Sequence, residues 1–281
     1  MKNLNLKIKH LKWLQSIGIE YYCSLNQKES KNNLIQSYNE LNTIKDEKNS
    51  LIKNMEIVMT KTIKQEKTQK KNTSIITPSE EKARLLANAA TSLNILRQSI
   101  EDFDGIELKT FANNMVFSDG NPEAKIMLIG EAPGASEDAQ GIPFCGESGQ
   151  LLDQMLNTIN ISRKTNAYIT NTVFWRPPAN RPPTIEEINI CRPFVEKHIA
   201  LIKPKLIVLV GGTATTALLG KNEGITFIRK NNYSYINQYL DEQIVVTALF
   251  HPAYLLRQPM QKKATWYDLL KLKDLIKELN I

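Results

Sequence analysis

Residues 125–134 read KIMLIGEAPG, a short apolar run at 125–130 that leads into a glycine-rich turn. Three further apolar, β-rich runs follow along the chain, at 167–173, 206–211 and 244–250. Segments with helical spacing separate these runs, and such alternation is typical of a parallel sheet that is covered by helices on both faces. We therefore predict a three-layer α/β/α sandwich built on a four-stranded parallel sheet.

Apolar residues at helical spacing predict the helices of this sandwich. One helix is indicated around 151–159, and the next begins at Thr184, where Glu187 three residues later completes a capping box. A last helix is predicted over 261–279. Before the sheet, the apolar spacing predicts a single helix over 79–103 that packs on the core.

The composition of the 281 residues, 42% of them hydrophobic, fits one sizeable core plus an appendage. The formal net charge of +7 favours a polyanionic partner, although a Lys-rich coding bias is the alternative source of this charge. The three cysteines are too scattered for a disulfide framework. No apolar run reaches the length of a membrane span or a signal-peptide core, so we expect a cytoplasmic protein and no membrane partner.

The chain changes character near residue 80. We predict a short N-terminal helical segment at 1–26, a Lys/Asn-rich flexible or loosely helical linker at 27–78, and an α/β domain at 79–281. Lysines between 61 and 71 either hold a polyanion weakly or are only solvated, and we favour the solvated interpretation.

Polar side chains follow three of the predicted strands at the point where each strand ends. Glu131 follows Gly130 after the first strand, Asn171 ends the second, and His251 follows the last. Ligands of open parallel sheets bind outside the carboxyl ends of the strands, so these residues are candidates for one site. Taken singly, each has a structural alternative: Asn171 as a turn cap, His251 as a core histidine, Glu131 as a backbone cap.

Six sequence blocks, quoted in chain order, resemble those of family 4 uracil-DNA glycosylases. They are GEAPG at 130–134, QGIPF at 140–144, GQLL at 149–152, ITN at 169–171, RPPANR at 176–181 and HPAYLLR at 251–257. The resemblance covers about 100–275 and implies the uracil-DNA glycosylase fold. It also implies a monofunctional glycosylase of base-excision repair, which hydrolyses the N-glycosidic bond of deoxyuridine and leaves an abasic site.

The resemblance also implies roles for the strand-end residues. Uracil is hidden in the base stack and has to be flipped out before it is cut. Phe144 then matches the aromatic residue that stacks on the ring, and Asn171 the residue that reads its polar edge. His251 matches the donor that stabilises the departing base, while Gly130 and Ala132 line the site.

The residue that positions the attacking water is not settled by the resemblance. Glu131 stands where family 1 enzymes carry a Gln, and Ala132 where they carry the water-positioning Asp. Glu131 and Glu137 are therefore both candidates for this role.

A wedge and a set of phosphate contacts are expected to grip uracil-containing DNA. The candidate DNA contacts are Arg176, Asn180, Arg181, Tyr254, Leu255, Leu256 and Arg257. The alternative for Leu255 and Leu256 is that they begin a buried helix.

The chain departs from the family at the cysteines that hold a four-iron cluster. Phe103, Ile106 and Trp175 stand at three of the four positions, and Cys191 is the one ligand that remains. Because iron–sulfur clusters need thiolate ligands, we predict no cluster, no metal and no other cofactor. A second departure is Ala179, which stands where the family usually has Gly.

The competing interpretation is a noncatalytic DNA-binding or scaffold protein on a glycosylase fold. Uracil release from oligonucleotides separates the two. In either case we expect a monomer, with the N-terminal region as the candidate contact for a repair or replication partner.

Overall fold

Four parallel strands form the centre of a six-stranded sheet in the computed structural model of the chain, which describes residues 76–221 and 223–281. These strands are β2 (Ile126–Gly130), β3 (Ala167–Asn171), β4 (Leu206–Val210) and β6 (Ile244–Leu249). Each of their bounds lies within two residues of the predicted run, so the parallel sheet is confirmed. The predicted segment at 1–26 and nearly all of that at 27–78 lie outside the described residues.

The prediction of four strands was incomplete at both edges of the sheet. The strand order is β1-β3-β2-β4-β6-β5, and the added edge strands β1 (Asp119–Gly120) and β5 (Tyr233–Tyr235) are antiparallel to their neighbours. Runs of two and three residues are too short to show an alternating pattern, which explains why the sequence did not indicate them.

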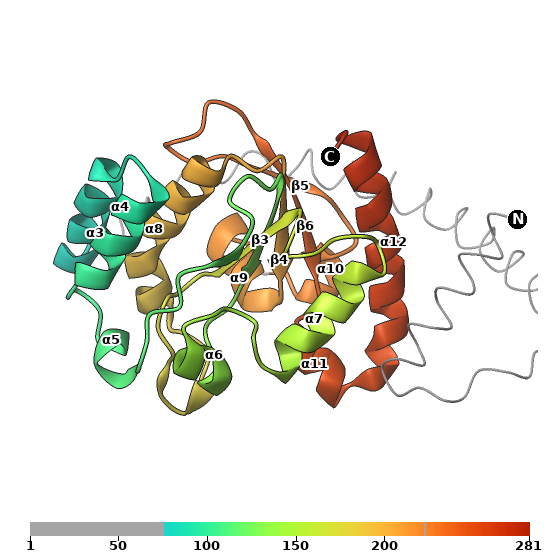
Figure 1. The fold of residues 1–281 in the computed structure, drawn as a ribbon, viewed down its shortest axis with the longest axis horizontal. Helices are drawn as coiled ribbons and strands as arrows, with labels where there is room; N and C mark the ends of the chain where they lie inside the picture. The colour runs from blue at the N-terminus through green and yellow to red at the C-terminus, as the bar shows by residue number, and fades with distance from the viewer. Residues whose placement is uncertain (1–75, 222) are drawn as a thin grey trace, which may run out of the picture. The chain divides into compact units, whose positions relative to one another are not determined.

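Helices cover both faces of the sheet, which confirms the three-layer architecture (Figure 1). The crossovers are α7 (Glu147–Asn157) from β2 to β3, α8 (Ile185–Ile202) from β3 to β4 and α9 (Gly212–Leu219) from β4 to β6. Right-handed crossovers in this strand order place α7 on one face and both α8 and α9 on the other. The last helix, α12 (Lys262–Glu278), confirms the prediction over 261–279.

The single helix predicted over 79–103 is wrong, because the structure divides it into α3 (Pro78–Ala89) and α4 (Leu93–Asp102). Each helix has its own N-terminal cap: the Thr77 side chain accepts from Glu80 N–H, and the Ser92 side chain accepts from Ile95 N–H. A second cap in the middle of an apolar repeat restarts the helix at a new angle. Both helices pack on α8.

Short helices form much of the loop structure between the longer elements. They are α5 (Leu108–Phe111), α6 (Ala135–Gln140), η1 (Pro178–Asn180), α10 (Ile225–Ile228), α11 (Pro252–Arg257) and η2 (Pro259–Gln261). Among them, α6, η1 and α11 follow β2, β3 and β6, so they lie beyond the carboxyl ends of the parallel strands. Among the residues that the structure describes, no helix has the length and apolar character needed to cross a bilayer.

Candidate active site

The carboxyl ends of β2 and β3 meet at Gly130 and Asn171, which pair in the parallel register. Just beyond them, Thr172 N–H donates to Gly130 O at 3.0 Å, and the Thr172 hydroxyl donates to Glu131 O at 2.6 Å. These two bonds hold the first residues after both strands side by side. The segments that follow β2 and β3 are therefore held together instead of forming two independent loops.

Gly130 lies in contact with both Phe144 and Asn171. A Cβ atom at Gly130 would lie 2.5 Å from Asn171 Oδ1 and 2.5 Å from the Phe144 ring, so only glycine fits there. Asn171 is buried, and its Oδ1 atom has no hydrogen-bond partner among the described residues. A buried acceptor without a partner is costly unless a ligand supplies the missing donor.

His251 lies beside Phe144, so the structure brings together Phe144, Asn171 and His251, the residues to which the resemblance gave roles in base recognition. Its ring centroid lies 5.8 Å from that of Phe144, with an interplanar angle of 33°. As the N-cap of α11, His251 accepts a hydrogen bond at Nδ1 from Ala253 N–H, at 3.2 Å. Burial lowers the pKa of His251 below its usual value of 6.5, against the opposing charge of Glu131. The neutral ring therefore carries its hydrogen on Nε2 and has one donor to offer.

The two candidate glutamates occupy different environments. Both carboxylate oxygens of Glu137 accept backbone hydrogen bonds, Oε2 from Gly134 N–H at 3.1 Å and Oε1 from Cys145 N–H at 3.1 Å and Gly146 N–H at 3.0 Å. Glu131 is half-buried, and the charges of both glutamates raise the pKa of His251 against the larger effect of burial, that of Glu131 more than that of Glu137. The two residues therefore differ in their backbone bonds: the Glu137 carboxylate is engaged in holding loops together.

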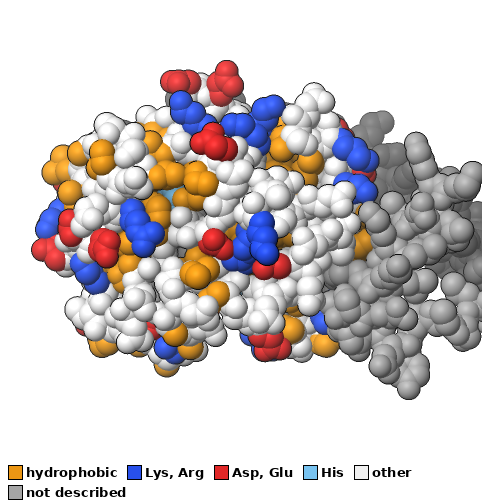
Figure 2. Space-filling model, viewed as in Figure 1, with side chains coloured by type: hydrophobic (Ala, Val, Ile, Leu, Met, Phe, Trp, Pro, Cys, Tyr) orange, Lys and Arg blue, Asp and Glu red, His pale blue; other side chains and the backbone are white. Residues whose placement is uncertain are grey.

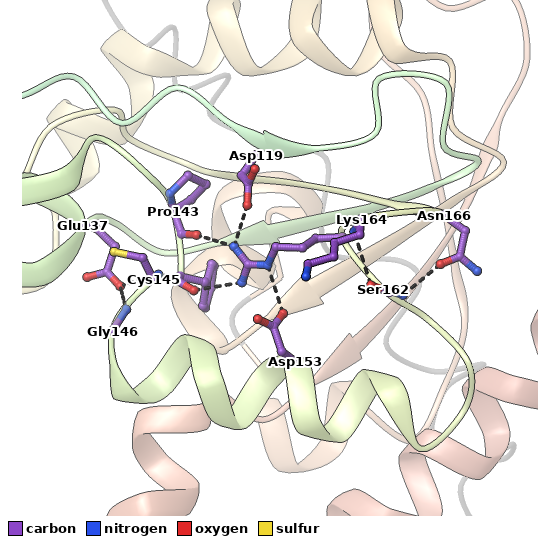
Figure 3. Close-up of polar contacts among 11 residues, drawn as sticks. Asp119, Glu137, Pro143, Cys145, Gly146, Asp153, Ser162, Lys164 and Asn166 are labelled. Carbon is purple, nitrogen blue, oxygen red and sulfur yellow. Dashed lines mark hydrogen bonds and ion pairs between the residues drawn. The ribbon is translucent and has the colours of Figure 1, made fainter.

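Arg163 is a residue of this region that the sequence analysis missed. It lies in the loop before β3, and its guanidinium donates to two carboxylates and to the carbonyl oxygens of Pro143 and Phe144 (Figure 3). No motif marks the position, because a single Arg between a helix and a strand is an ordinary surface pattern. The burial of its side chain, which is 14% exposed, is visible only in the fold.

The predicted DNA contacts after β3 form a small network of their own. Arg176 Nε donates to Asn180 Oδ1 at 2.8 Å, and its Nη1 lies 3.8 Å from the buried carboxylate of Asp138. Arg181 forms a two-pronged ion pair with Glu187 and is 41% exposed. Arg181 is therefore accessible to solvent although it is paired with Glu187, whereas Arg176 contacts residues of its own loop and Asp138.

This loop also contains two consecutive residues with positive φ, Ala179 at 54° and Asn180 at 55°. Asparagine tolerates this left-handed conformation well, but alanine does not. Ala179, which stands where the resemblance leads us to expect Gly, thus places local strain in the loop.

The predicted DNA contacts after β6 lie on α11, and they divide by exposure. Leu255 is fully buried, so the prediction that it touches DNA is not supported, and the alternative of a buried helix holds for this residue. Tyr254 and Leu256 are half-buried and Arg257 is exposed. Leu256 therefore remains the candidate for an apolar wedge, with Arg257 beside it.

The four positions that correspond to the family's cluster ligands lie in one apolar region, the hydrophobic core that includes α8. Phe103, Ile106, Trp175 and Cys191 are all buried there, and the Phe103 ring packs edge-on against Phe194 at 5.3 Å. Burial raises the pKa of the Cys191 thiol to about 12. Phenyl, alkyl and indole side chains cannot ligate iron, so these residues do not fit an iron–sulfur cluster. Among the described residues, no group of three or more His, Cys, Asp or Glu side chains could hold a metal ion.

Comparison with known proteins gives consistent matches to one family. A family model described as the uracil DNA glycosylase superfamily matches residues 117–271. The type-4 uracil-DNA glycosylase of Sulfurisphaera tokodaii is 37% identical over 186 residues, which are 66% of this chain and 84% of the relative. That of Saccharolobus solfataricus is 35% identical over 187 residues, 65% of this chain and 86% of the relative. That of Thermotoga maritima is 34% identical over 189 residues, 66% and 95% of the two chains.

Proposed function

The chain belongs to the uracil-DNA glycosylase superfamily and is a uracil-DNA glycosylase, and from this premise we propose how it excises its base. The proposed reaction is hydrolysis of the N-glycosidic bond of a flipped-out deoxyuridine in base-excision repair. It releases uracil and leaves an abasic site, with no covalent enzyme intermediate. The resemblance inferred from the sequence blocks is confirmed, while the individual residue roles are proposals.

The observation that carries this proposal is the unpartnered Oδ1 of Asn171 beside the Phe144 ring. The N3–H of uracil is the donor that Oδ1 lacks, and the side-chain NH2 of Asn171 would donate to O4. Cytosine presents an acceptor at N3 and a donor at the neighbouring position, so both contacts would be mismatched. A site built to hydrogen-bond one polar edge rejects the wrong edge by roughly four to five orders of magnitude.

The His251 imidazole would stabilise the departing base. Cleavage of the N-glycosidic bond places negative charge on the uracil ring, and Nε2–H is the hydrogen-bond donor available to its O2 atom. The bond from Ala253 N–H to Nδ1 fixes the tautomer that this role requires. A neutral donor suits the role because it stabilises the developing anion without having to give up its proton.

We assign the positioning of the attacking water to Glu131 rather than Glu137. The support for this choice is that the Glu137 carboxylate accepts hydrogen bonds from backbone amides on both of its oxygens. Both charges act on His251, and that of Glu131 has the larger effect on its pKa. A carboxylate there can also stabilise the positive charge that develops on the sugar.

DNA binding would depend on local contacts at the site, because the described domain carries no net charge. Residues 76–281 hold 22 Lys and Arg and 22 Asp and Glu, so the whole formal excess of +7 lies in residues 1–75. Figure 2 shows basic and acidic side chains interspersed over one face of the domain instead of one basic surface. Arg181 and Arg257 are the exposed candidates for phosphate contacts, and Leu256 for the wedge. Residues 1–75 would add a sequence-independent attraction to DNA.

The proposal is tested with the purified full-length protein on single- and double-stranded oligonucleotides that carry one uracil. Release of uracil and an alkali-labile abasic site are expected, with no release from matched oligonucleotides that carry cytosine or thymine. Binding without release would favour the noncatalytic scaffold interpretation instead. We further propose that the enzyme is cytoplasmic and acts as a monomer. Sedimentation of the protein alone and with DNA would check the monomeric state.

A further inference from the structure

The loop that carries Phe144 has an unfavourable backbone conformation. Phe144 has φ of +52°, in the left-handed region that residues with a side chain seldom adopt. Its carbonyl is packed so closely on α7 that a Cβ atom at Gly149 would lie 1.8 Å from Phe144 O. A conformation of this kind persists only when surrounding contacts hold it in place.

A cation holds the carbonyl side of the loop. Arg163 Nη1 donates to Pro143 O at 2.9 Å, and Nη2 donates to Phe144 O at 2.8 Å. The same guanidinium donates through Nη1 to Asp119 Oδ2 at 2.9 Å and through Nε to Asp153 Oδ1 at 3.0 Å. Figure 3 shows Asp119, Pro143 and Asp153 converging on it from different parts of the chain. Arg163 therefore ties the loop to the edge strand β1 and to α7 at once.

An anion holds the amide side of the same loop. Glu137 Oε1 accepts from Cys145 N–H at 3.1 Å and from Gly146 N–H at 3.0 Å, and Oε2 accepts from Gly134 N–H. Gly134 belongs to the turn after β2 that begins at Gly130 and Glu131. Glu137 thus joins the Phe144 loop to the turn that lies beside Asn171 and His251.

Arg163 and Glu137 bind consecutive peptide groups of the loop, and each faces the groups of opposite partial charge. The carbonyls of Pro143 and Phe144 point to a guanidinium, and the N–H groups of Cys145 and Gly146 point to a carboxylate. Hydrogen bonds to ionised groups are roughly twice as strong as neutral ones. Arginine is needed on the carbonyl side because its planar fork reaches four acceptors at once, which the point charge of a lysine cannot do.

We propose that Arg163 and Glu137 are positioning residues that hold Phe144 in its left-handed conformation so that its ring forms one wall of the base pocket. This proposal rests on the proposed function, because it assigns the ring to stacking on uracil. Neither residue touches the base; each acts through the loop backbone. Glu137 therefore influences turnover by holding the pocket wall and not by activating water.

The kinetic test compares Arg163→Lys and Glu137→Gln with the full-length wild type. Both substitutions keep the size of the side chain, but Lys loses the fork and Gln places an NH2 donor against backbone donors. A displacement of about 1 Å in a binding wall costs roughly a hundredfold in rate, so kcat is expected to fall by about that factor. KM should stay unchanged, because phosphate contacts dominate the affinity for DNA.

Matched controls come from elsewhere in the chain. Glu80→Gln alters the corresponding carboxylate of the α3 cap, and Arg84→Lys alters a partly exposed arginine on the same helix. Both are remote from the Phe144 loop and should leave kcat unchanged. Asp153→Asn removes one anchor of Arg163 but keeps both carbonyl bonds, so it should reduce kcat less than Arg163→Lys does.

A second readout needs no activity. Cys145 lies in the loop that Arg163 and Glu137 hold in place, and we call this pair of residues the clamp. Burial, followed by the charge of Glu137, raises the pKa of the Cys145 thiol, which slows its reaction with a disulfide reagent. Labelling is therefore measured over a pH range and expressed per thiolate, so that a change in pKa alone does not count. In a Cys23→Ser background, this labelling of Cys145 should be faster by roughly tenfold in Arg163→Lys and Glu137→Gln, as expected for loss of a hydrogen bond to a charged group. The buried thiol of Cys191 should not contribute, and Cys145→Ser identifies the signal.

The outcomes separate the two proposals. Faster labelling with a lower kcat supports both. If the wild type releases no uracil but labelling still accelerates in the two variants, the proposed function fails and the clamp stands. If both variants label and turn over like the wild type, the clamp is overturned while the glycosylase assignment is kept.

Discussion

The candidate site at the strand ends, formed by Gly130, Phe144, Asn171 and His251 and called the pocket below for its proposed role, and the apolar region around Phe103 are both assembled from residues far apart in sequence. They differ in what they leave unsatisfied. At the candidate site, Asn171 Oδ1 is buried without a partner among the described residues, and His251 has a donor at Nε2. Around Phe103, the side chains of Ile106, Trp175 and Cys191 pack into a continuous apolar core.

The difference separates residues kept for chemistry from residues kept for stability. Unpartnered polar groups lower stability and are useful only when a ligand completes them. Apolar packing contributes stability and offers no group for a reaction. Substitutions in the pocket should therefore change turnover and spare the fold, while those in the apolar region should do the reverse.

The largest expected effect is on stability. Phe103→Ala would remove a fully buried ring that packs on Phe194, and such changes cost about 3–5 kcal/mol of unfolding free energy. Denaturant unfolding measures this loss. Well below its melting temperature the variant should keep the kcat of the wild type, and a large drop in kcat under these conditions would break the distinction between the two regions.

His251→Ala should have the next largest effect, mainly on the reaction, with a smaller loss of about 1 kcal/mol of stability because the side-chain cap of α11 is removed. Loss of one donor to a developing anion raises the barrier by about 2.7–4 kcal/mol. Single-turnover uracil release measures the change, alongside binding to an uncleavable substrate, which should be retained. Equal turnover in the variant and the wild type would remove His251 from the mechanism.

Gly130→Ala tests whether the pocket depends on close packing at its floor. The new Cβ would lie 2.5 Å from both Asn171 Oδ1 and the Phe144 ring, so one of the two has to move. A shift of about 1 Å in these groups predicts a loss of roughly a hundredfold in kcat/KM. Discrimination between uracil and cytosine should weaken at the same time; an unchanged ratio would show that the shift spares Asn171.

Acid should destabilise the domain through His198, a buried polar residue of α8 that packs against Phe117 and Tyr168, away from Phe103, and whose Nδ1 has no partner among the described residues. Its Nε2 lies 2.8 Å from the Tyr168 hydroxyl, its ring stacks on Phe117, and burial lowers its pKa from 6.5 to about 3. Between these values the unfolded chain binds a proton that the folded chain does not, so stability is lost as pH falls below 6.5.

The resulting loss is about 2 kcal/mol between pH 7 and pH 5, from one lowered pKa. Unfolding curves at the two pH values measure it. In His198→Gln, which does not titrate, the difference between the curves should shrink by about that amount. The same pH dependence in the variant and the wild type would assign the acid sensitivity to other groups.

Cys191→Ala is the smallest change. It removes one buried sulfur atom and should cost about 1 kcal/mol. Because Cys191 has no thiolate partners at the other three positions, iron should be at background in both the wild type and the variant. Metal analysis and the visible absorption spectrum check this, and stoichiometric iron in the wild type would contradict the ligand argument.

The sequence by itself determined the parallel strands and the residues at their ends. Buried strands and long helices leave a periodic pattern, and the carboxyl ends of parallel strands share one edge, so the pattern alone placed Asn171 and His251 together. The capping box at Thr184 was equally local and was confirmed. The motif blocks added Phe144, whose position no periodicity indicates.

Tertiary structure alone decided the rest. The break between α3 and α4, the burial of Leu255 and the loop bonds of Glu137 and Arg163 follow from contacts between segments that are distant or irregular. Secondary structure repeats along the chain and so marks the sequence, whereas a hydrogen bond between two loops involves single residues and leaves no repeating trace. The pocket's polar groups were therefore predictable, but the clamp that fixes its aromatic wall was not.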